Sequence, residues 1–303
     1  MIEVNELTKR YGSTTAVNRL TFTVRPGRVT GFLGPNGAGK STTLRMILGL
    51  NEPTGGTATV DGHSFRGRPR GLRHVGALLD AHDVHGGRSA RAHLSALARS
   101  NAIPLSRVDE VLREVGLADA GRRRIGGFSL GMKQRLGIAT ALLGDPPVLL
   151  FDEPLNGLDP EGVLWVRGLF RRLAAQGRTV FVSSHLMSEM ENTADELVVI
   201  GRGELIAAQS LAEFAGRGNR LTVTVRTPEE AALAAVLAAE GGSAEPDGAG
   251  ALAVTGLSAA RIGELALRRR IVLHELAPRA ASLEEAFMEL TADRVDYPAG
   301  EAR

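Results

Sequence analysis

The sequence lacks cysteine, so it has no disulfide framework, which suits a reducing compartment. It also lacks long apolar runs. None approaches the ~18 residues of a membrane-spanning helix, and the N-terminal MIEVNELTKRYG does not form an apolar signal segment. A net charge of only +2 does not indicate broad nucleic-acid binding. These absences predict a soluble, cytoplasmic protein that reaches a membrane only through a partner.

Lysine is scarce, with only 3 among the 36 basic residues, the others being arginine. Lys9 lies near Tyr11, whereas Lys40 and Lys133 each lie in a glycine-containing motif. A compact ammonium contacts phosphate differently from a planar guanidinium, so the two are not freely interchangeable at phosphate sites. The scarcity therefore directs attention to the motifs around Lys40 and Lys133.

The first two hundred residues alternate strand-like and helix-like apolar runs. The strand-like runs cover 29–34, 148–153 and 179–184, and helical patterns cover 42–50 and 163–176. These strands are too apolar to have a solvent-exposed face, which indicates an α/β fold with a parallel sheet covered by helices on both sides. The 303 residues, 43% of them hydrophobic, suffice for one large domain or two.

Two further regions interrupt and follow this α/β pattern. Residues 88–130 are mainly helical in pattern, which predicts a helical insert within an α/β domain spanning 1–216. Beyond about residue 216 the composition changes, and the pattern predicts a small α+β accessory domain of βαβαβα order over 217–303. Within it we expect a flexible loop at 241–251 (GGSAEPDGAGA) and a strand at 271–277.

The segment GPNGAGKST, residues 34–42, follows an apolar strand and opens a helix, which is the context of a phosphate-binding loop. Its glycines let backbone N–H groups surround a β-phosphate, and the helix N-terminus adds its positive dipole end. Lys40 would reach the β- and γ-phosphates, and the Ser41 hydroxyl would ligate Mg²⁺. The alternative, a chance glycine-rich turn, is disfavoured by this placement. The loop's predicted nucleotide-binding residues are Gly34, Asn36, Gly37, Gly39, Lys40, Ser41 and Thr42.

A second motif, VLLFDEP, places two acids at the end of an apolar strand. Asp152 can hold Mg²⁺, usually through water, as the acid of the neighbouring strand does in phosphate-loop NTPases. Glu153 points elsewhere, because side chains alternate along a strand, and it could accept a proton from the attacking water. The alternative is that both acids merely end a strand at a solvated turn.

In their order and spacing, the motifs of residues 1 to about 216 resemble those of the ATP-binding subunits of ABC transporters. The resemblance implies a phosphate-loop NTPase fold, ATP and Mg²⁺ as cofactors, and ATP hydrolysis with Glu153, His185 and Lys40 as the catalytic residues. It also implies a separate integral-membrane permease as partner, a location on the inner face of the cell membrane, and no nucleic-acid partner.

Four further motifs have roles only through this resemblance. Tyr11 is similar to the aromatic residue that stacks on adenine, and His185 is similar to the switch histidine at the γ-phosphate. The alternatives are that Tyr11 is an ordinary tyrosine at a strand end and that His185 has a structural role. NGLD, with Asp159, resembles the D-loop. FSLGMKQR resembles the signature segment, in which Ser129 and Gly131 would cap the ATP of the other subunit in a head-to-tail homodimer. Taken alone, that stretch is a helix N-terminus capped by Ser129.

Two departures from the family pattern matter, one in the signature segment and one at Asp80. Leu130 and Met132 replace the glycine and glutamine of the usual LSGGQ signature. Asp80, in VGALLD, stands where the family usually has a glutamine that reaches Mg²⁺ and the attacking water. A carboxylate is a competent ligand of hard cations but adds negative charge beside the γ-phosphate, so whether Asp80 is a metal ligand stays open.

The combination of VGALLD and SLGMKQRL resembles the subgroup of bacitracin, lantibiotic and daunorubicin-type resistance exporters, and the ending SLEEAFMELT resembles ATPases of two-gene exporters. An importer ATPase and a soluble ABC ATPase acting on the ribosome or DNA are the alternatives. One ATPase motif set without coiled-coil heptads disfavours the soluble type. The histidines near Asp80 indicate a solvated loop rather than a metal site, since no converging acids accompany them. They are His74, His82, His85 and His93.

Overall fold

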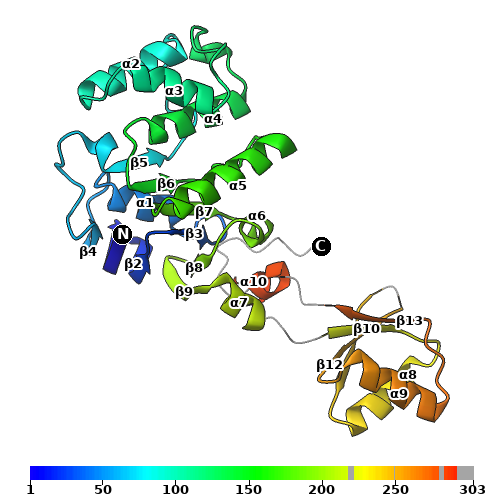
Figure 1. The fold of residues 1–303 in the computed structure, drawn as a ribbon. Coiled ribbons are helices and arrows are strands. Elements are labelled where there is room, and N and C mark those ends of the chain that lie inside the picture. The colour runs from blue at the N-terminus through cyan, green and yellow to red at the C-terminus, as the bar shows by residue number, and fades with distance from the viewer. Residues whose placement is uncertain (218–221, 249, 280–282, 292–303) are drawn as a thin grey trace. The chain divides into compact units, whose positions relative to one another are not determined.

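The computed structural model describes residues 1–217, 222–248, 250–279 and 283–291 (Figure 1). Among the described residues the chain separates into two compact units, one built from Met1–Leu211 with Leu290 and Thr291, and the other from Ala212–Glu289. The expected boundary near residue 216 falls close to this division, and the assignment of the two units as separate domains stays a prediction.

A six-stranded sheet forms the centre of the first unit, in the order β5-β6-β7-β3-β8-β9. Five neighbouring strands pair in parallel and β9 is antiparallel to β8, so the predicted parallel α/β sheet is confirmed. The strands are β3 (Arg28–Leu33), β5 (Val75–Leu78), β6 (Val148–Phe151), β7 (Thr179–Ser184), β8 (Glu196–Gly201) and β9 (Glu204–Ser210).

Both faces of the central strands are covered, as their continuous apolar sequences predict. All four residues of β6 are buried. Val148 and Leu150 belong to the core on one face, whereas the ring of Phe151 packs at a tilt against that of Phe170 of α5 (Pro160–Ala175), with 4.7 Å between the ring centroids. Alternate residues of one strand therefore serve two separate layers of packing.

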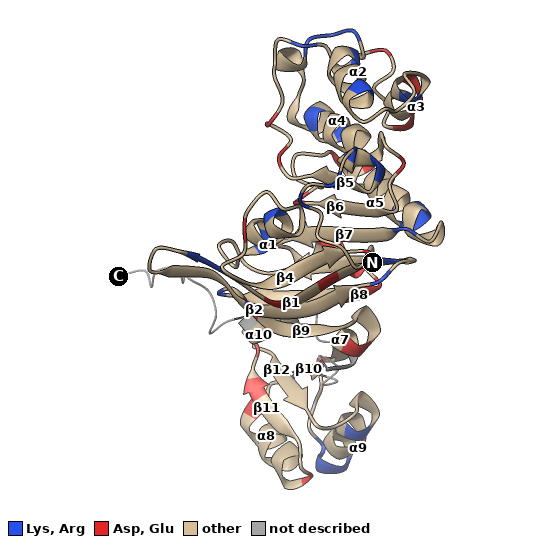
Figure 2. Cartoon of the chain, turned by 90° about the vertical axis from the view of Figure 1, so that its left-hand side faces the viewer, with Lys and Arg blue, Asp and Glu red and all other residues tan. Residues whose placement is uncertain are grey.

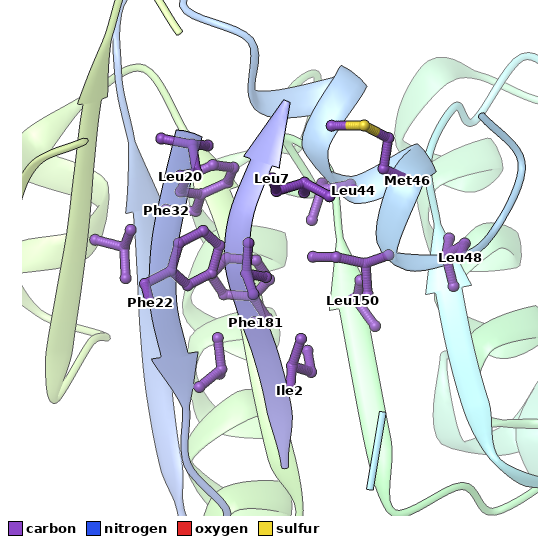
Figure 3. Packing of buried hydrophobic residues seen from close by; sticks show 14 of the residues in the cluster. Ile2, Leu7, Leu20, Phe22, Phe32, Leu44, Met46, Leu48, Leu150 and Phe181 are labelled. Carbon is purple, nitrogen blue, oxygen red and sulfur yellow. The ribbon is translucent and has the colours of Figure 1, made fainter. Parts of the chain in front are cut away.

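The core on the first face lies between the parallel sheet, α1 (Lys40–Ile47) and a three-stranded antiparallel sheet that the sequence patterns did not reveal. That sheet has the order β2-β1-β4, with β1 at Ile2–Tyr11, β2 at Thr14–Val24 and β4 at Gly55–Val60. Phe22, Phe32 and Phe181 gather in this core (Figure 3), and the Phe32 and Phe181 centroids are 5.0 Å apart. The packing holds β3, and so the loop that follows it, against the N-terminal sheet.

The predicted helical insert contains α2 (Ala90–Ser100) and α3 (Ser106–Glu114), which lead to α4 (Leu130–Leu142). The charged residues of α2 and α4 are all basic, whereas α3 carries both signs (Figure 2), and Arg91 of α2 forms an ion pair with Asp109 of α3. A short helix, α6 (Met187–Glu191), follows β7. In the described parts of the chain, no helix combines the length and apolar character needed to cross a membrane.

The second unit contains a four-stranded antiparallel sheet of order β11-β12-β10-β13. With two helices between the strands, its βαββαβ arrangement is ferredoxin-like. After α7 (Leu211–Arg217) come β10 (Thr222–Arg226), α8 (Glu230–Ala239), β11 (Ser243–Pro246), β12 (Leu252–Thr255), α9 (Ala259–Arg269) and β13 (Glu275–Arg279), and α10 (Leu283–Thr291) ends the described chain.

Two expectations for this unit were wrong in detail. The stretch 241–251 is not loop throughout, because β11 pairs with β12 and Ala244 packs against the unit's core. The last strand begins at Glu275 instead of residue 271, because Val272 lies outside the strand ladder and its carbonyl accepts a hydrogen bond from Thr227 Oγ1 at 2.7 Å.

Candidate functional site

The loop after β3 encloses a cavity of about 260 Å³ at the start of α1. Gly37 and Gly39 adopt φ values of 85° and 99°, in the region that favours glycine. A Cβ on Gly39 would lie 2.5 Å from the carbonyl oxygen of Ala16, so the loop packs too closely on β2 for any side chain there. The cavity is lined by Ala16, Asn36, Gly37, Ala38, Gly39, Lys40, Ser41, Thr42 and Glu153.

Lys40 is the buried cation of this cavity, with 6% of its side chain exposed. Its Nζ donates to the carbonyl of Gly34 at 2.6 Å and lies 3.5 Å from Oε1 of Glu153. Burial lowers the pKa of the Lys40 ammonium, although the charge and hydrogen bond of Glu153 oppose the shift. An ammonium held in this way can contact phosphate oxygens without first losing a full hydration shell.

Asp152 and Glu153 follow β6, and both form hydrogen bonds with Ser183, a residue that the sequence patterns missed. The Ser183 hydroxyl, fully buried at the end of β7, donates to Oδ1 of Asp152 and accepts the backbone N–H of Glu153 at 3.0 Å. Glu153 itself has a φ of 47°, which is uncommon for a residue with a side chain. The turn therefore directs the two carboxylates differently, as the predicted division of roles requires.

His185 lies directly beside Glu153, with 2.9 Å between Nδ1 and Oε2. The structure thus links Lys40, Glu153 and His185 in one chain of contacts. Glu189 of α6 lies next to this chain and accepts a hydrogen bond from the Ser184 hydroxyl. Burial raises the pKa of the Glu189 carboxyl, the Ser184 hydrogen bond lowers it, and the charge of Glu153 adds to the increase.

Ser41 lines the cavity. Asp152, which follows β6, accepts a hydrogen bond from the hydroxyl of Ser183 on the neighbouring strand β7. No group of three or more His, Cys, Asp or Glu side chains that could hold a metal ion occurs among the described residues. A hydroxyl and a carboxylate fit Mg²⁺, which is commonly held by few protein ligands together with substrate phosphates and water. The donor set therefore fits a cation that arrives with a nucleotide.

Asp80 lies two residues after β5 with an exposed side chain. Its Oδ1 accepts the backbone N–H of His82 at 2.7 Å, which stabilises a local turn. His85 likewise accepts its own loop's Gly87 N–H at 3.2 Å, consistent with a structured surface loop. Metal ligation by Asp80 stays a prediction, because these contacts explain its position without a cation.

The segment around Ser129 begins α4, and Ser129 is its N-cap, accepting the backbone N–H of Met132 at 3.2 Å. The structure brings it beside the NGLD turn: a Cβ on Gly131 would lie 3.2 Å from the carbonyl oxygen of Gly157. Asp159 caps α5 in the same manner, accepting from Gly162 N at 2.9 Å. The predicted N-cap role of Ser129 is confirmed, the cap at Asp159 was not predicted, and the nucleotide contacts of both residues stay predictions.

Tyr11 ends β1 with 50% of its surface exposed. Its hydroxyl accepts from Asn51 Nδ2 at 2.9 Å, and Lys9 Nζ lies 5.1 Å from its ring centroid. Lys9 is in turn held by the carbonyl of Glu52 at 2.6 Å. An exposed ring fixed at its hydroxyl is suited to stacking, and its contact with adenine stays a prediction.

Comparisons with known proteins agree with this geometry. Residues 17–156 match the family model of the ABC transporter domain, and residues 221–284 match a domain of unknown function. An uncharacterized ABC transporter ATP-binding protein of Bacillus subtilis is 35% identical over 97% of this chain and 96% of its own length. The bacitracin transport ATP-binding protein of Bacillus licheniformis is 43% identical, covering 68% of each chain. A solved ATP-binding subunit of an ABC transporter, 27% identical, superposes with a TM-score of 0.66 over 72% of this chain and 92% of its own.

Proposed function

The chain belongs to the ATP-binding subunits of ABC transporters and hydrolyses ATP, and from this premise we propose that it drives export of peptide antibiotics or drugs through a separate permease. The similarity to a bacitracin transport protein supports this substrate class. The observation that carries the catalytic part is the contact chain Lys40–Glu153–His185 at the loop cavity.

Each member of that chain has a distinct proposed task. Lys40 binds the β- and γ-phosphates, Glu153 accepts the proton of the attacking water, and His185 holds Glu153 and the γ-phosphate in position. Ser41 and Asp152 would hold Mg²⁺, which would neutralise charge on the phosphates. The close approach of Lys40 and His185 to Glu153 supports these roles, because it puts base and phosphate ligands at one place.

We also propose that the working unit is a head-to-tail dimer on the inner face of the membrane. Ser129 is exposed at the start of α4, where its hydroxyl and the helix N-terminus could meet the γ-phosphate of a partner's ATP. The residues that line the phosphate-loop cavity do not include any from α4. A composite site would require this, because there the signature segment comes from the other subunit.

A transport assay tests the exporter proposal. The chain is co-expressed with a candidate permease, chosen from the membrane proteins of the same genome, in a host sensitive to bacitracin-type peptides. We expect the inhibitory concentration of at least one peptide to rise several-fold, because efflux lowers its concentration at the target. Glu153→Gln is the matched control and should remove the protection while both proteins remain expressed. Protection that is equal with the variant, or missing for every peptide, contradicts the proposal.

A further inference from the structure

Gln134 is a buried polar residue of α4 that none of the roles above uses. Only 6% of it is exposed, and its Nε2 donates to two carbonyls of the turn after β6, Glu153 at 3.4 Å and Asn156 at 3.2 Å. We propose that Gln134 is a positioning residue for hydrolysis, which holds the backbone of Glu153 and couples its carboxylate to the signature helix α4.

The turn that Gln134 contacts needs an external restraint. Glu153 has a φ of 47°, and a non-glycine residue in this left-handed region is strained and persists only where its surroundings hold it. Ser183 restrains the N–H side of Glu153, and Gln134 binds its carbonyl side. The two bonds together fix the peptide planes on both sides of the carboxylate.

The bonding of Gln134 indicates a role other than stability. Among the described residues its Oε1 has no hydrogen-bond partner, and a buried unpaired acceptor is unfavourable for folding. The carbonyl of Glu153 also accepts the N–H of Asn156 at 3.3 Å, so it would not be left unpaired without Gln134. An apolar side chain of the same length is therefore expected to keep the fold.

A second contact joins the same two elements. A Cβ on Gly157 would lie 2.2 Å from Cδ2 of Leu130, so Leu130 rests directly on the backbone of this turn. Leu130 occupies the first turn of α4 and Gln134 the second, four residues later on the same face. The start of α4 and the turn 153–157 are thus attached at two points, and a displacement of one displaces the other.

The inference rests on the proposed role of Glu153 as general base. Gln134→Met tests it, because methionine keeps the length and removes both donated bonds. We expect kcat of the complete chain to fall on the order of tenfold, as is usual when a hydrogen bond is lost, with KM and the Kd for ATP within about twofold. Gln176→Met, an exposed glutamine at the end of α5, is the matched control and should keep wild-type kcat.

Gln134→Glu supplies a readout that a packing defect would not produce. Its carboxylate cannot donate to the two carbonyls, whereas the protonated acid can donate to one, and burial beside carbonyl oxygens raises the pKa of such an acid. Glu153, the ionisable residue whose carbonyl Gln134 binds, is paired with Lys40 and His185 in the wild type, and the substitution leaves those two residues unchanged. Turnover at each pH is therefore expressed relative to the wild type. This ratio should rise several-fold between pH 9 and pH 6, while the ratio for Gln134→Met stays constant.

The outcomes separate this inference from the proposed base. If Glu153→Gln is inactive but Gln134→Met keeps kcat within twofold, the positioning role is wrong and the base role stands. If Glu153→Gln turns over like the wild type, the base role itself is wrong. A loss of ATP affinity that matches the loss of kcat in Gln134→Met also overturns the inference. Should Gln134→Met fail to fold, a pH-independent ratio for Gln134→Glu is the overturning result.

Discussion

At the scale of single residues, Asp80 is the position where the chain differs most from its family's catalytic pattern. Its carboxylate accepts from His82 N in an exposed loop, so the structure accounts for it as a turn residue. If it also ligates Mg²⁺, Asp80→Asn should raise the Mg²⁺ concentration needed for half-maximal ATP turnover several-fold, because an amide oxygen is a weaker ligand than a carboxylate.

The measurement is ATPase rate against free Mg²⁺ at saturating ATP. Asp83→Asn, which removes a charge from the same exposed loop, is the control for a general electrostatic effect. Superimposable Mg²⁺ titrations for Asp80→Asn and the wild type would show that Asp80 serves only the loop.

Glu189 predicts a pH dependence of stability. Burial raises the pKa of its carboxyl above the ordinary 4.5, so the folded chain retains a proton that the unfolded chain releases. The contribution of this proton to the free energy of unfolding is fully present below about pH 4.5 and is lost as pH rises through the folded-state pKa. The loss is about 1.4 kcal/mol for each unit by which the folded-state pKa exceeds the unfolded one. Glu189→Gln has no such proton and should gain in free energy of unfolding, relative to the wild type, as pH increases over this window.

Urea denaturation at several pH values from 4.5 to 8 measures this difference. Glu191→Gln, on an exposed position of the same helix, should follow the wild type throughout. A constant difference between Glu189→Gln and the wild type would show that the Glu189 carboxyl titrates normally in the fold.

At the scale of elements, α4 meets the NGLD turn where Leu130 lies against Gly157. Gly157 has a φ of 73°, and Leu130 fills the space that a Cβ there would need. Gly157→Ala should therefore destabilise the chain by about 2–4 kcal/mol, from left-handed strain together with overpacking.

A double-mutant cycle separates these two causes. Leu130→Ala removes the clash but not the strain, so the double variant should lose about 1–2 kcal/mol less than the sum of the two single changes. Thermal or urea unfolding of all four proteins gives the coupling. Strict additivity would mean that Leu130 can move away from Gly157 at no cost.

At the scale of the whole molecule, a head-to-tail dimer predicts complementation between two inactive variants. Lys40→Ala damages the phosphate loop, and Ser129→Arg damages the segment that caps the partner's nucleotide. Each homodimer then has two damaged sites. In a mixed dimer both lesions fall in one site, and the other is built from an intact loop and an intact signature, so it should occlude ATP.

Occlusion of labelled ATP in differentially tagged, co-purified mixed dimers measures this result. Roughly half the wild-type occlusion is expected, because one of two sites is intact; hydrolysis is the less direct readout, since both sites could be required for it. Purified mixed dimers that occlude no ATP would falsify the trans-capping role of Ser129.

The elements that carry the phosphate-loop motifs were predictable from sequence because these motifs are contiguous. Residues 34–42 span the junction of β3 and α1, and Asp152 and Glu153 follow β6, so local patterns sufficed to place them on these elements. Their contacts with nucleotide and metal stay predictions. The same locality explains why Ser129 was expected as the cap of a helix. The N-terminal antiparallel sheet was not predicted, because its pairing depends on partners far along the chain.

The hydrogen bonds that hold Asp152 and Glu153 in position were decided only by the tertiary structure. Ser183 reaches Glu153 across 30 residues and Gln134 reaches it across 19, and no spacing rule relates these positions. The contact of Leu130 with Gly157 and the burial of Glu189 likewise arise from packing between elements. Sequence by itself therefore determined which chemical groups the chain carries and on which elements they lie. The fold determined how those groups are held, because side-chain orientation depends on neighbours that only three-dimensional packing brings together.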